Sequence, residues 1–264
     1  MKDATVSTMT ENEYRSLPAL NASRFKAFFR SPFHFFNQKE VEETEPMRIG
    51  TAIHTAILEP ENYLRTIAFY PEADGRTTEG KAIKKAFEAE AVGKTILKAD
   101  SKEVVERAVK AVTTHQEVRL ILANAENRRE QVLLTRMWEQ DCKARLDLIN
   151  VETGVIRDIK SCDDASPEKF KYDVRDRLYW VQAGFYCLVA EKVFGKPFGF
   201  EFIAVEKGDP STCTIYDVDA KELEMWKHIV DCNLSHLAAC TNTKAWTGYE
   251  SKTLGSLNLS QYLS

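Results

Sequence analysis

Two aspartates in the middle of the chain are spaced so that they could share a metal ion. Extended runs at residues 144–150 and 155–160 are joined by the turn residues 151–154. If these strands pair symmetrically across the turn, Asp147 faces Asp158. The Cβ atoms of such a cross-strand pair lie about 4.5 to 5.5 Å apart, and like charges in that position destabilise a sheet. A cation between the two carboxylates would remove this repulsion.

A lysine two positions after the second aspartate adds to this pattern. Lys160 projects from the same face of its strand as Asp158. The residues expected on the opposite, apolar face are Leu146, Leu148 and Ile159. Mg²⁺, for which Mn²⁺ would substitute, commonly binds through one or two carboxylates together with phosphate and water. Such an ion activates water and neutralises charge on a phosphodiester, while an ammonium group stabilises the charge that develops. The alternative is an ordinary ion pair between Lys160 and one of two unrelated acids.

Other polar residues could complete such a site. Gln182 and Tyr186 are four residues apart on an expected helix, and Tyr179 precedes Gln182 by three, so the three form one polar stripe. His54 interrupts an apolar stretch, and Glu130 stands at the start of the first expected strand. A second carboxylate such as Glu130 would suit a two-metal site. The alternative for Gln182, Tyr186 and His54 is a structural role, in which buried polar groups satisfy one another.

Composition leaves the partner open. The chain has 264 residues, 44% of them hydrophobic and 29% charged, so it can bury a large core in one domain. The net charge of −4 gives no general attraction to nucleic acid, so local basic patches would have to provide it. Each of three basic clusters could bind a line of phosphates or could be an ordinary solvated helix face. The clusters are Arg24, Lys26 and Arg30; Arg76, Lys81, Lys84 and Lys85; and Lys169, Lys171, Arg175 and Arg177.

The same survey argues against several other classes of protein. Six scattered cysteines without a CxxC pair support neither a disulfide framework nor a zinc ribbon, and they are expected to be reduced. No secretory signal and no run of about 18 apolar residues is found, so we expect no membrane partner and a cytoplasmic location.

The expected elements place these residues on a sheet. Residues 1–20 are expected to form an arm, followed by a helix capped by Asn21 or Ser23 and interrupted at Pro32. Helices give way to three strands, a strong helix over about 176–194, and two more strands. This order predicts an α/β (α+β) fold with a mixed central sheet flanked by helices. The expected parts are an arm (1–20), a mainly helical part (21–125), a catalytic sheet core (126–218) and a C-terminal helix with its tail (219–264).

Together these motifs resemble a known pattern. Asp147, the tripeptide 158–160 and the pair Gln182 and Tyr186 resemble the PD-(D/E)XK nucleases, in the exonuclease branch with a Q-x-x-x-Y helix motif. Residues 47–54 and 58–61, the 76–81 loop and the order of later elements resemble the nuclease domain of exonuclease VIII, the RecE type, over nearly the whole chain. The first acid stands between two leucines here, where the pattern has a Pro-Asp pair.

This resemblance implies a restriction-endonuclease-like core with an N-terminal helical elaboration. It implies a Mg²⁺-dependent exonuclease that digests the 5′ strand of linear double-stranded DNA and leaves 3′ tails for a strand-annealing protein of the RecT type, in recombination and repair. It also implies a homo-oligomeric ring around DNA, a tetramer if like exonuclease VIII or a trimer if closer to lambda exonuclease, as in a phage-encoded enzyme. A ring would reconcile acidic composition with DNA binding, because basic loops can gather in its pore.

Site residues follow from the resemblance by position. His54, Asp147, Asp158 and the Ile159 carbonyl would bind metal, with Glu130 as a further ligand. Lys160 would be catalytic, and Gln182 and Tyr186 would support the site or touch the DNA backbone. The DNA contacts expected beyond the centre are Arg24, Arg76, Lys81 and Tyr179. Two alternatives remain, an endonuclease on the same core and an inactive DNA-binding subunit.

Overall fold

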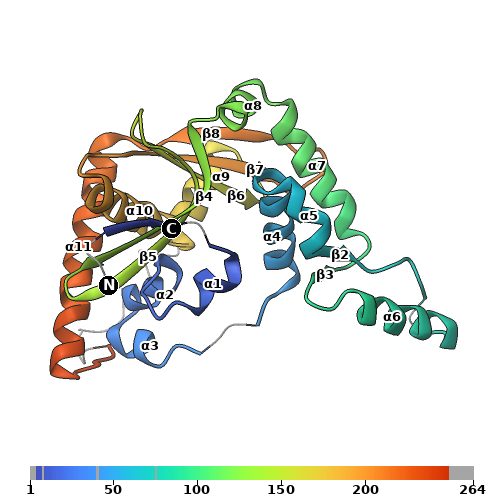
Figure 1. The fold of residues 1–264 in the computed structure, drawn as a ribbon, viewed down its shortest axis with the longest axis horizontal. Helices are drawn as coiled ribbons and strands as arrows, with labels where there is room; N and C mark the ends of the chain where they lie inside the picture. Colours follow the sequence, from blue (N-terminus) through green and yellow to red (C-terminus); the bar gives the residue numbers. More distant parts are fainter. Residues whose placement is uncertain (1–3, 8, 40–41, 75, 250–264) are drawn as a thin grey trace, which may run out of the picture.

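A six-stranded sheet forms the centre of the computed structural model, which describes residues 4–7, 9–39, 42–74 and 76–249 (Figure 1). Its strand order is β1-β4-β5-β6-β7-β8. The strands are β1 (Ala4–Ser7), β4 (Asn127–Met137), β5 (Gln140–Asn150), β6 (Val155–Cys162), β7 (Gly199–Glu206) and β8 (Cys213–Asp217). The β6–β7 pair is parallel and the other neighbours are antiparallel, so the predicted mixed sheet is confirmed.

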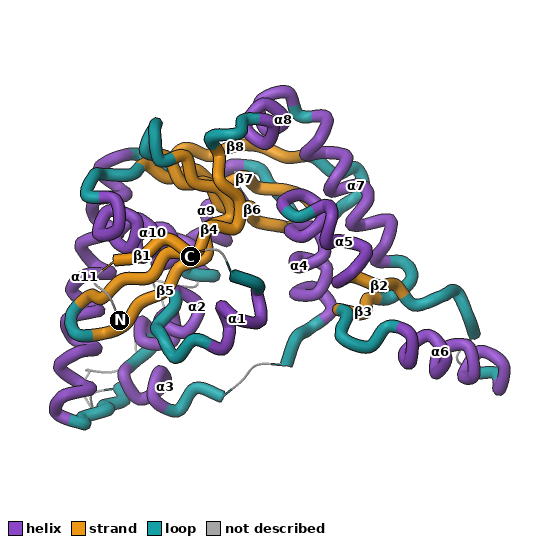
Figure 2. Tube along the Cα trace, in the orientation of Figure 1, coloured by secondary structure: helices purple, strands orange, loops and turns teal. Residues whose placement is uncertain are grey.

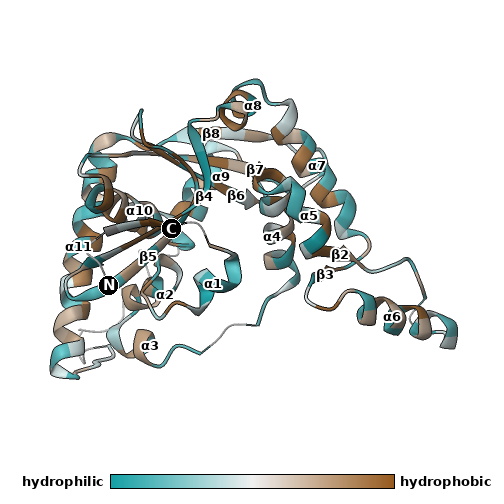
Figure 3. Ribbon diagram, in the orientation of Figure 1, coloured by the Kyte–Doolittle hydropathy of each residue, from teal (hydrophilic) through white to brown (hydrophobic). Residues whose placement is uncertain are grey.

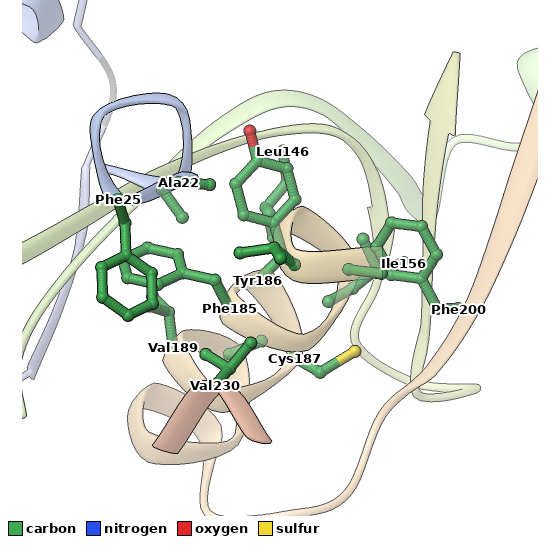
Figure 4. Close-up of a cluster of buried hydrophobic side chains, with 14 of the residues drawn as sticks. Ala22, Phe25, Leu146, Ile156, Phe185, Tyr186, Cys187, Val189, Phe200 and Val230 are labelled. Atoms are coloured by element: carbon green, nitrogen blue, oxygen red, sulfur yellow. The ribbon is translucent and has the colours of Figure 1, made fainter. Parts of the chain in front are cut away.

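Helices cover both faces of this sheet and create two apolar cores. On one face α10 (Tyr179–Phe194) packs against β4, β5 and β7, and α11 (Ala220–Thr243) packs on α10. We call this the α10 core; Figure 4 shows Phe185 of α10 and Phe25 of the N-terminal helices within it. On the other face α4 (Glu45–Leu58) and α7 (Ser101–Thr114) pack against β6 and β7, and this is the α4 core. Helix α10 is apolar on nearly all sides and shows little amphipathic colouring in Figure 3. A helix of this kind must be buried.

The parallel pairing of β6 with β7 requires a crossover, which α9 (Pro167–Asp176) and α10 provide. Leu178 between them has a left-handed backbone, with φ 53°, so the chain turns and α10 begins at Tyr179, three residues later than expected. Gly195, with φ 69°, ends α10 as predicted. This crossover carries Gln182 to Asp158 of β6, to which its side-chain amide donates a hydrogen bond.

The remaining elements are short. They are α1 (Glu11–Ser16), α2 (Ala22–Phe25), the 3₁₀ helix η1 (Lys26–Phe29), α3 (Pro32–Phe36), α5 (Pro60–Thr66), β2 (Ile67–Phe69), α6 (Thr78–Glu90), β3 (Thr95–Leu97) and α8 (Gln116–Ala123). Strands β2 and β3 pair in parallel as a separate small sheet, and α6 extends away from the main sheet (Figure 2). Among these described helices, none combines the length and the apolar composition needed to cross a lipid bilayer.

The N-terminal expectations were wrong for the arm and right for the interruption at Pro32. The expected arm is structured: β1 pairs with the edge of β4, and α1 begins with a capping box between Thr10 and Glu13. Pro32 starts a new helix at its first turn, where its missing N–H costs nothing, with Ser31 as the N-cap. Asn21 caps α2 as expected, since its side chain accepts the Arg24 N–H. The expected tail falls partly on residues 250–264, outside the described residues.

Candidate active site

Strands β5 and β6 part at the two aspartates. Their ladder pairs Asn150 with Val155 and Leu148 with Arg157, which is the predicted register, and it ends there. One position further, Asp147 Oδ2 accepts a hydrogen bond from the Ile159 N–H at 2.7 Å. The side chain of Asp147 therefore satisfies a strand donor that a continued ladder would have paired. The aspartates are adjacent as predicted, but they flank an opening between strands and not a closed pair.

The apolar layer behind the site differs from the expected one. Leu146, Leu148 and Ile159 are all buried, but Leu146 packs in the α10 core whereas Leu148 and Ile159 pack in the α4 core. The change of side coincides with an irregularity in β4, where Glu130 has φ 49°. Positive φ is uncommon for residues other than glycine, and such strain gathers at functional sites.

Three potential metal ligands meet at this irregularity. The neighbours of Glu130 pair with the neighbours of Asp147, so the two acids stand opposite each other. His54 reaches them from α4: its Nε2 lies 2.6 Å from Asp147 Oδ2, and its Nδ1 lies 3.3 Å from Glu130 Oε1. One ligand atom from each of the three residues lies within 4.8 Å of the others. Sequence patterns suggested each of these residues separately, and the fold brings them together.

Electrostatics favours the charged forms of His54 and Asp147. Burial acts to lower the pKa of His54, but the charges and hydrogen bonds of Asp147 and Glu130 raise it well above its ordinary value. Burial acts to raise the pKa of Asp147, but the His54 charge and hydrogen bond, then Lys160 and the Ile159 N–H, lower it. For Glu130 burial prevails and the pKa is raised. A proton therefore sits on the imidazole between two acids, in a place where a cation is favoured.

The second aspartate is buried, and one of its oxygens is held only by an ion pair. Asp158 is 1% exposed, and its Oδ1 accepts a hydrogen bond of 2.9 Å from Gln182 Nε2. Lys160 Nζ lies 2.5 Å from Oδ2, an ion-pair distance, but Oδ2 receives no aligned hydrogen bond from any described residue. Burial, and next the Asp147 charge, raise the pKa of Asp158 to about 6 despite the nearby Lys160. A carboxylate oxygen has two lone pairs, so Oδ2 can accept a cation in addition to its ion pair with Lys160.

Lys160 and Gln182 form a network around that carboxylate. Lys160 Nζ donates to Gln182 Oε1 at 3.1 Å and lies 4.6 Å from the centroid of the Tyr179 ring. Burial opposes the charge on Lys160, but Asp158 and then Asp147 raise its pKa, so it is a cation at neutral pH. Gln182 thus contacts both Asp158 and Lys160 through its two amide atoms, and its supporting role stays a prediction.

The residues present fit a divalent cation. Two carboxylates and one imidazole lie together, and the charge of Asp158 acts on Asp147 beside them. A hard cation such as Mg²⁺ or Mn²⁺ takes carboxylate oxygens first. The residues that would hold it are Asp147, Asp158, His54 and Glu130. The backbone of Ile159 lies between the two aspartates through its bond to Asp147, and the ligand role of its carbonyl stays a prediction.

Tyr179 and Tyr186 border this centre, through Lys160 and Gln182 respectively, whereas Arg24, Arg76 and Lys81 do not. Tyr186 is 9% exposed and its ring lies in the α10 core near Leu146 (Figure 4), and burial raises the pKa of its hydroxyl well above the ordinary value. Arg24 is exposed, with its guanidinium 5.3 Å from the Phe35 ring centroid. Arg76 and Lys81 are exposed on the extended segment around α6, away from the main sheet (Figure 1). The structure therefore brings neither Arg24 nor the α6 residues into the centre.

Sequence reasoning missed one residue that anchors the centre. Arg145 Nε lies 2.5 Å from Glu130 Oε2, and its Nη2 lies 3.2 Å from Glu59 Oε2. Its third ion pair, to Glu11, ties helix α1 to the same network. Arg145 stands two positions before Asp147 on β5, so strand alternation was the available signal. Partners that hold a ligand in this way contribute to metal affinity.

Comparisons with known proteins agree with this fold. A crystal structure described as a "Putative exonuclease" from Eubacterium rectale superimposes with a TM-score of 0.64 at 15% sequence identity, covering 90% of this chain and 88% of that chain. At this identity the likeness concerns the fold. No curated protein matches the chain. A model of the family described as "PDDEXK-like domain of unknown function (DUF3799)" matches residues 21–253, a span that contains every residue of the centre. The chain therefore belongs to this family of PDDEXK-like domains.

Proposed function

We propose that the chain is a metal-dependent deoxyribonuclease. The observation that carries the proposal is the joint presence, at one opening of the sheet, of the His54–Glu130–Asp147 cluster and the buried Asp158 with Lys160 beside it. When bound there, Mg²⁺ would supply Lewis-acid stabilisation of phosphodiester oxygens and a water of lowered pKa.

The chain's own residues have distinct parts in that reaction. Asp147 is kept ionised by His54 and by the Ile159 N–H, so it is ready to accept a cation. Gln182 fixes the orientation of Asp158 and Lys160 through its two amide atoms. The raised pKa of Lys160 keeps it protonated, so its part is to stabilise negative charge and hold the water, and not to act as a general base.

The finer proposal concerns the substrate and its fate. We propose a cytoplasmic 5′ to 3′ exonuclease on linear double-stranded DNA, using Mg²⁺ and producing 3′ tails for a RecT-type annealing partner in recombination. We further propose a ring-shaped homo-oligomer, with a tetramer favoured over a trimer. Support comes from the resemblance to the RecE type and from the fold shared with the Eubacterium rectale protein, itself described as a putative exonuclease.

The form of the DNA tests this proposal. Linear duplex labelled at the 5′ or the 3′ end of one strand should lose only the 5′ label at early times with Mg²⁺, and nothing should be lost with chelator. Closed circular DNA of the same sequence should stay intact, because an exonuclease needs an end. Cutting of the circle would favour the endonuclease alternative, and loss of the 3′ label first would reverse the proposed polarity.

Metal affinity is expected to depend on pH through His54. The metal-free protein holds a proton on His54 because its pKa is raised well above the ordinary value, and a metal ion must displace that proton. Between pH 7 and 8, above the pKa of about 6 of Asp158, affinity for Mn²⁺ should therefore rise about tenfold with one proton released. Calorimetry in two buffers of different ionisation enthalpy measures both quantities. His54→Gln should flatten the slope, and a flat slope in the unmodified protein would contradict the assignment.

A further inference from the structure

A second lysine lies beside the catalytic network. Lys26 joins α2 to η1, and its Nζ lies 3.3 Å from Gln182 Oε1, across 156 residues of sequence. The same oxygen accepts Lys160 Nζ at 3.1 Å. The same aromatic ring also serves both lysines, because Lys26 Nζ lies 5.1 Å and Lys160 Nζ 4.6 Å from the Tyr179 centroid. Two ammonium groups therefore share one carbonyl oxygen and one ring.

The charges at this point do not balance. Asp158 forms an ion pair with Lys160, but no carboxylate in the described part of the chain lies within ion-pair distance of Lys26. Burial, and next the neighbouring Lys160 charge, lower the pKa of Lys26 to about 7. A half-buried ammonium whose nearest opposite charge, that of Asp158, is already paired with Lys160 is costly, and an anion placed beside it would reduce the cost.

The residues on either side of Lys26 pack against α10. Phe25 packs against Phe185 of α10, with ring centroids 6.0 Å apart, and Phe29 contacts Trp180 of the same helix at 5.2 Å. Figure 4 shows Phe25 directed toward Phe185. Because α10 also carries Gln182, one helix fixes the positions of both the lysine and its acceptor. A cation positioned this way loses little entropy when it binds a ligand.

We propose that Lys26 and Lys160 form a paired site for the DNA backbone, in which Lys26 binds one phosphate next to the phosphate that is cut. The inference rests on the proposed nuclease function and deepens it. A backbone phosphate suits the site because it presents several acceptor oxygens and a negative charge to two ammonium groups that otherwise repel each other. Within the basic cluster of Arg24, Lys26 and Arg30, the residue that contacts DNA is then Lys26 and not Arg24.

The test couples the lysine to a single phosphate. Binding is measured with Ca²⁺ in place of Mg²⁺, on short duplexes that each carry one uncharged methylphosphonate near the end. For the unmodified protein, neutralising the contacted phosphate should weaken binding about tenfold, the size expected of a charge-assisted hydrogen bond. Lys26→Met should weaken binding to normal DNA about tenfold. Neutralising the contacted phosphate should then cause this variant no further loss of binding. A merely structural role for Lys26 would leave the two effects additive.

Control variants separate the site from general effects. Lys196→Met is matched, because Lys196 also lies over an aromatic ring, that of Phe198, and donates to a backbone carbonyl, but at the far end of α10. Lys196→Met should lose as much binding as the unmodified protein does when each phosphate is neutralised. Lys26→Arg keeps the charge and should keep the coupling. If Lys26→Met melts at a much lower temperature, Lys26→Gln repeats the measurement.

Each outcome has one meaning. Additive losses at every phosphate in a protein that cleaves DNA would overturn the paired site and leave the nuclease proposal standing. If Lys26 and one phosphate are coupled, but the unmodified protein does not cleave DNA with Mg²⁺, the phosphate site is supported and the nuclease proposal is overturned. Failure to bind duplex DNA at all would overturn both.

Discussion

Asp158→Asn is expected to reduce Mg²⁺-dependent DNA cleavage at least about 10³-fold, because a metal ligand contributes several kcal/mol of transition-state stabilisation. The substitution keeps the size of the side chain and an oxygen for the Gln182 amide, so the 2.9 Å contact can survive. The charge is lost at the atom that has no aligned hydrogen bond among the described residues. Initial rates on end-labelled linear duplex, with circular dichroism as a check on folding, provide the measurement.

The matched control for this variant is Asp217→Asn. Asp217 ends β8 and is exposed, so the same chemical change on the same sheet should leave the rate within about twofold. Cleavage by folded Asp158→Asn at an undiminished rate would remove Asp158 from the mechanism.

Lys160→Met is expected to lower the rate of the chemical step by about 10² to 10³, the loss seen when one preorganised donor to a developing charge is removed. Metal binding should persist, because the carboxylates and His54 remain. DNA binding should weaken far less than the rate falls, because Lys160 acts on charge that develops in the transition state. Single-turnover rates at saturating protein separate the two effects.

A different result would assign Lys160 to another role. If saturating protein restored the rate of Lys160→Met, the lysine would contribute ground-state DNA binding alone. Loss of metal binding in that variant would instead mean that Lys160 chiefly maintains the ionised state of Asp158, from which its Nζ lies 2.5 Å.

The register of the central hairpin could be read from the sequence because local rules fix it. A turn that ends in a glycine with φ 70°, Gly154, sets the pairing of Asn150 with Val155, and alternation then places Asp147 next to Asp158. The same rules assume that the strands stay paired. They could not reveal that β5 and β6 part at this point, since the separation depends on Asp147 taking the Ile159 N–H and on the left-handed backbone at Glu130.

Contacts between distant segments account for the other differences. Lys26 belonged to a basic cluster that looked the same as any solvated helix face, and only the packing of Phe25 and Phe29 on α10 selects it over Arg24. The role of Arg145 could not be predicted from its strand. Its ion-pair partners Glu11 and Glu59 lie far from it in the sequence, on α1 and at the junction of α4 and α5. Strand β1 is short, and it is stabilised by the edge of β4 and not by its own sequence.

Calorimetric titration of Mg²⁺ or Mn²⁺ into the unmodified protein and into Asp158→Asn tests the central claim most directly, because it asks whether these side chains hold a metal ion before any DNA is present. We expect saturable binding by the unmodified protein and at least about tenfold weaker binding by the variant. Equal affinity in the two proteins, or no binding by either with or without DNA, would contradict a metal centre built on Asp158.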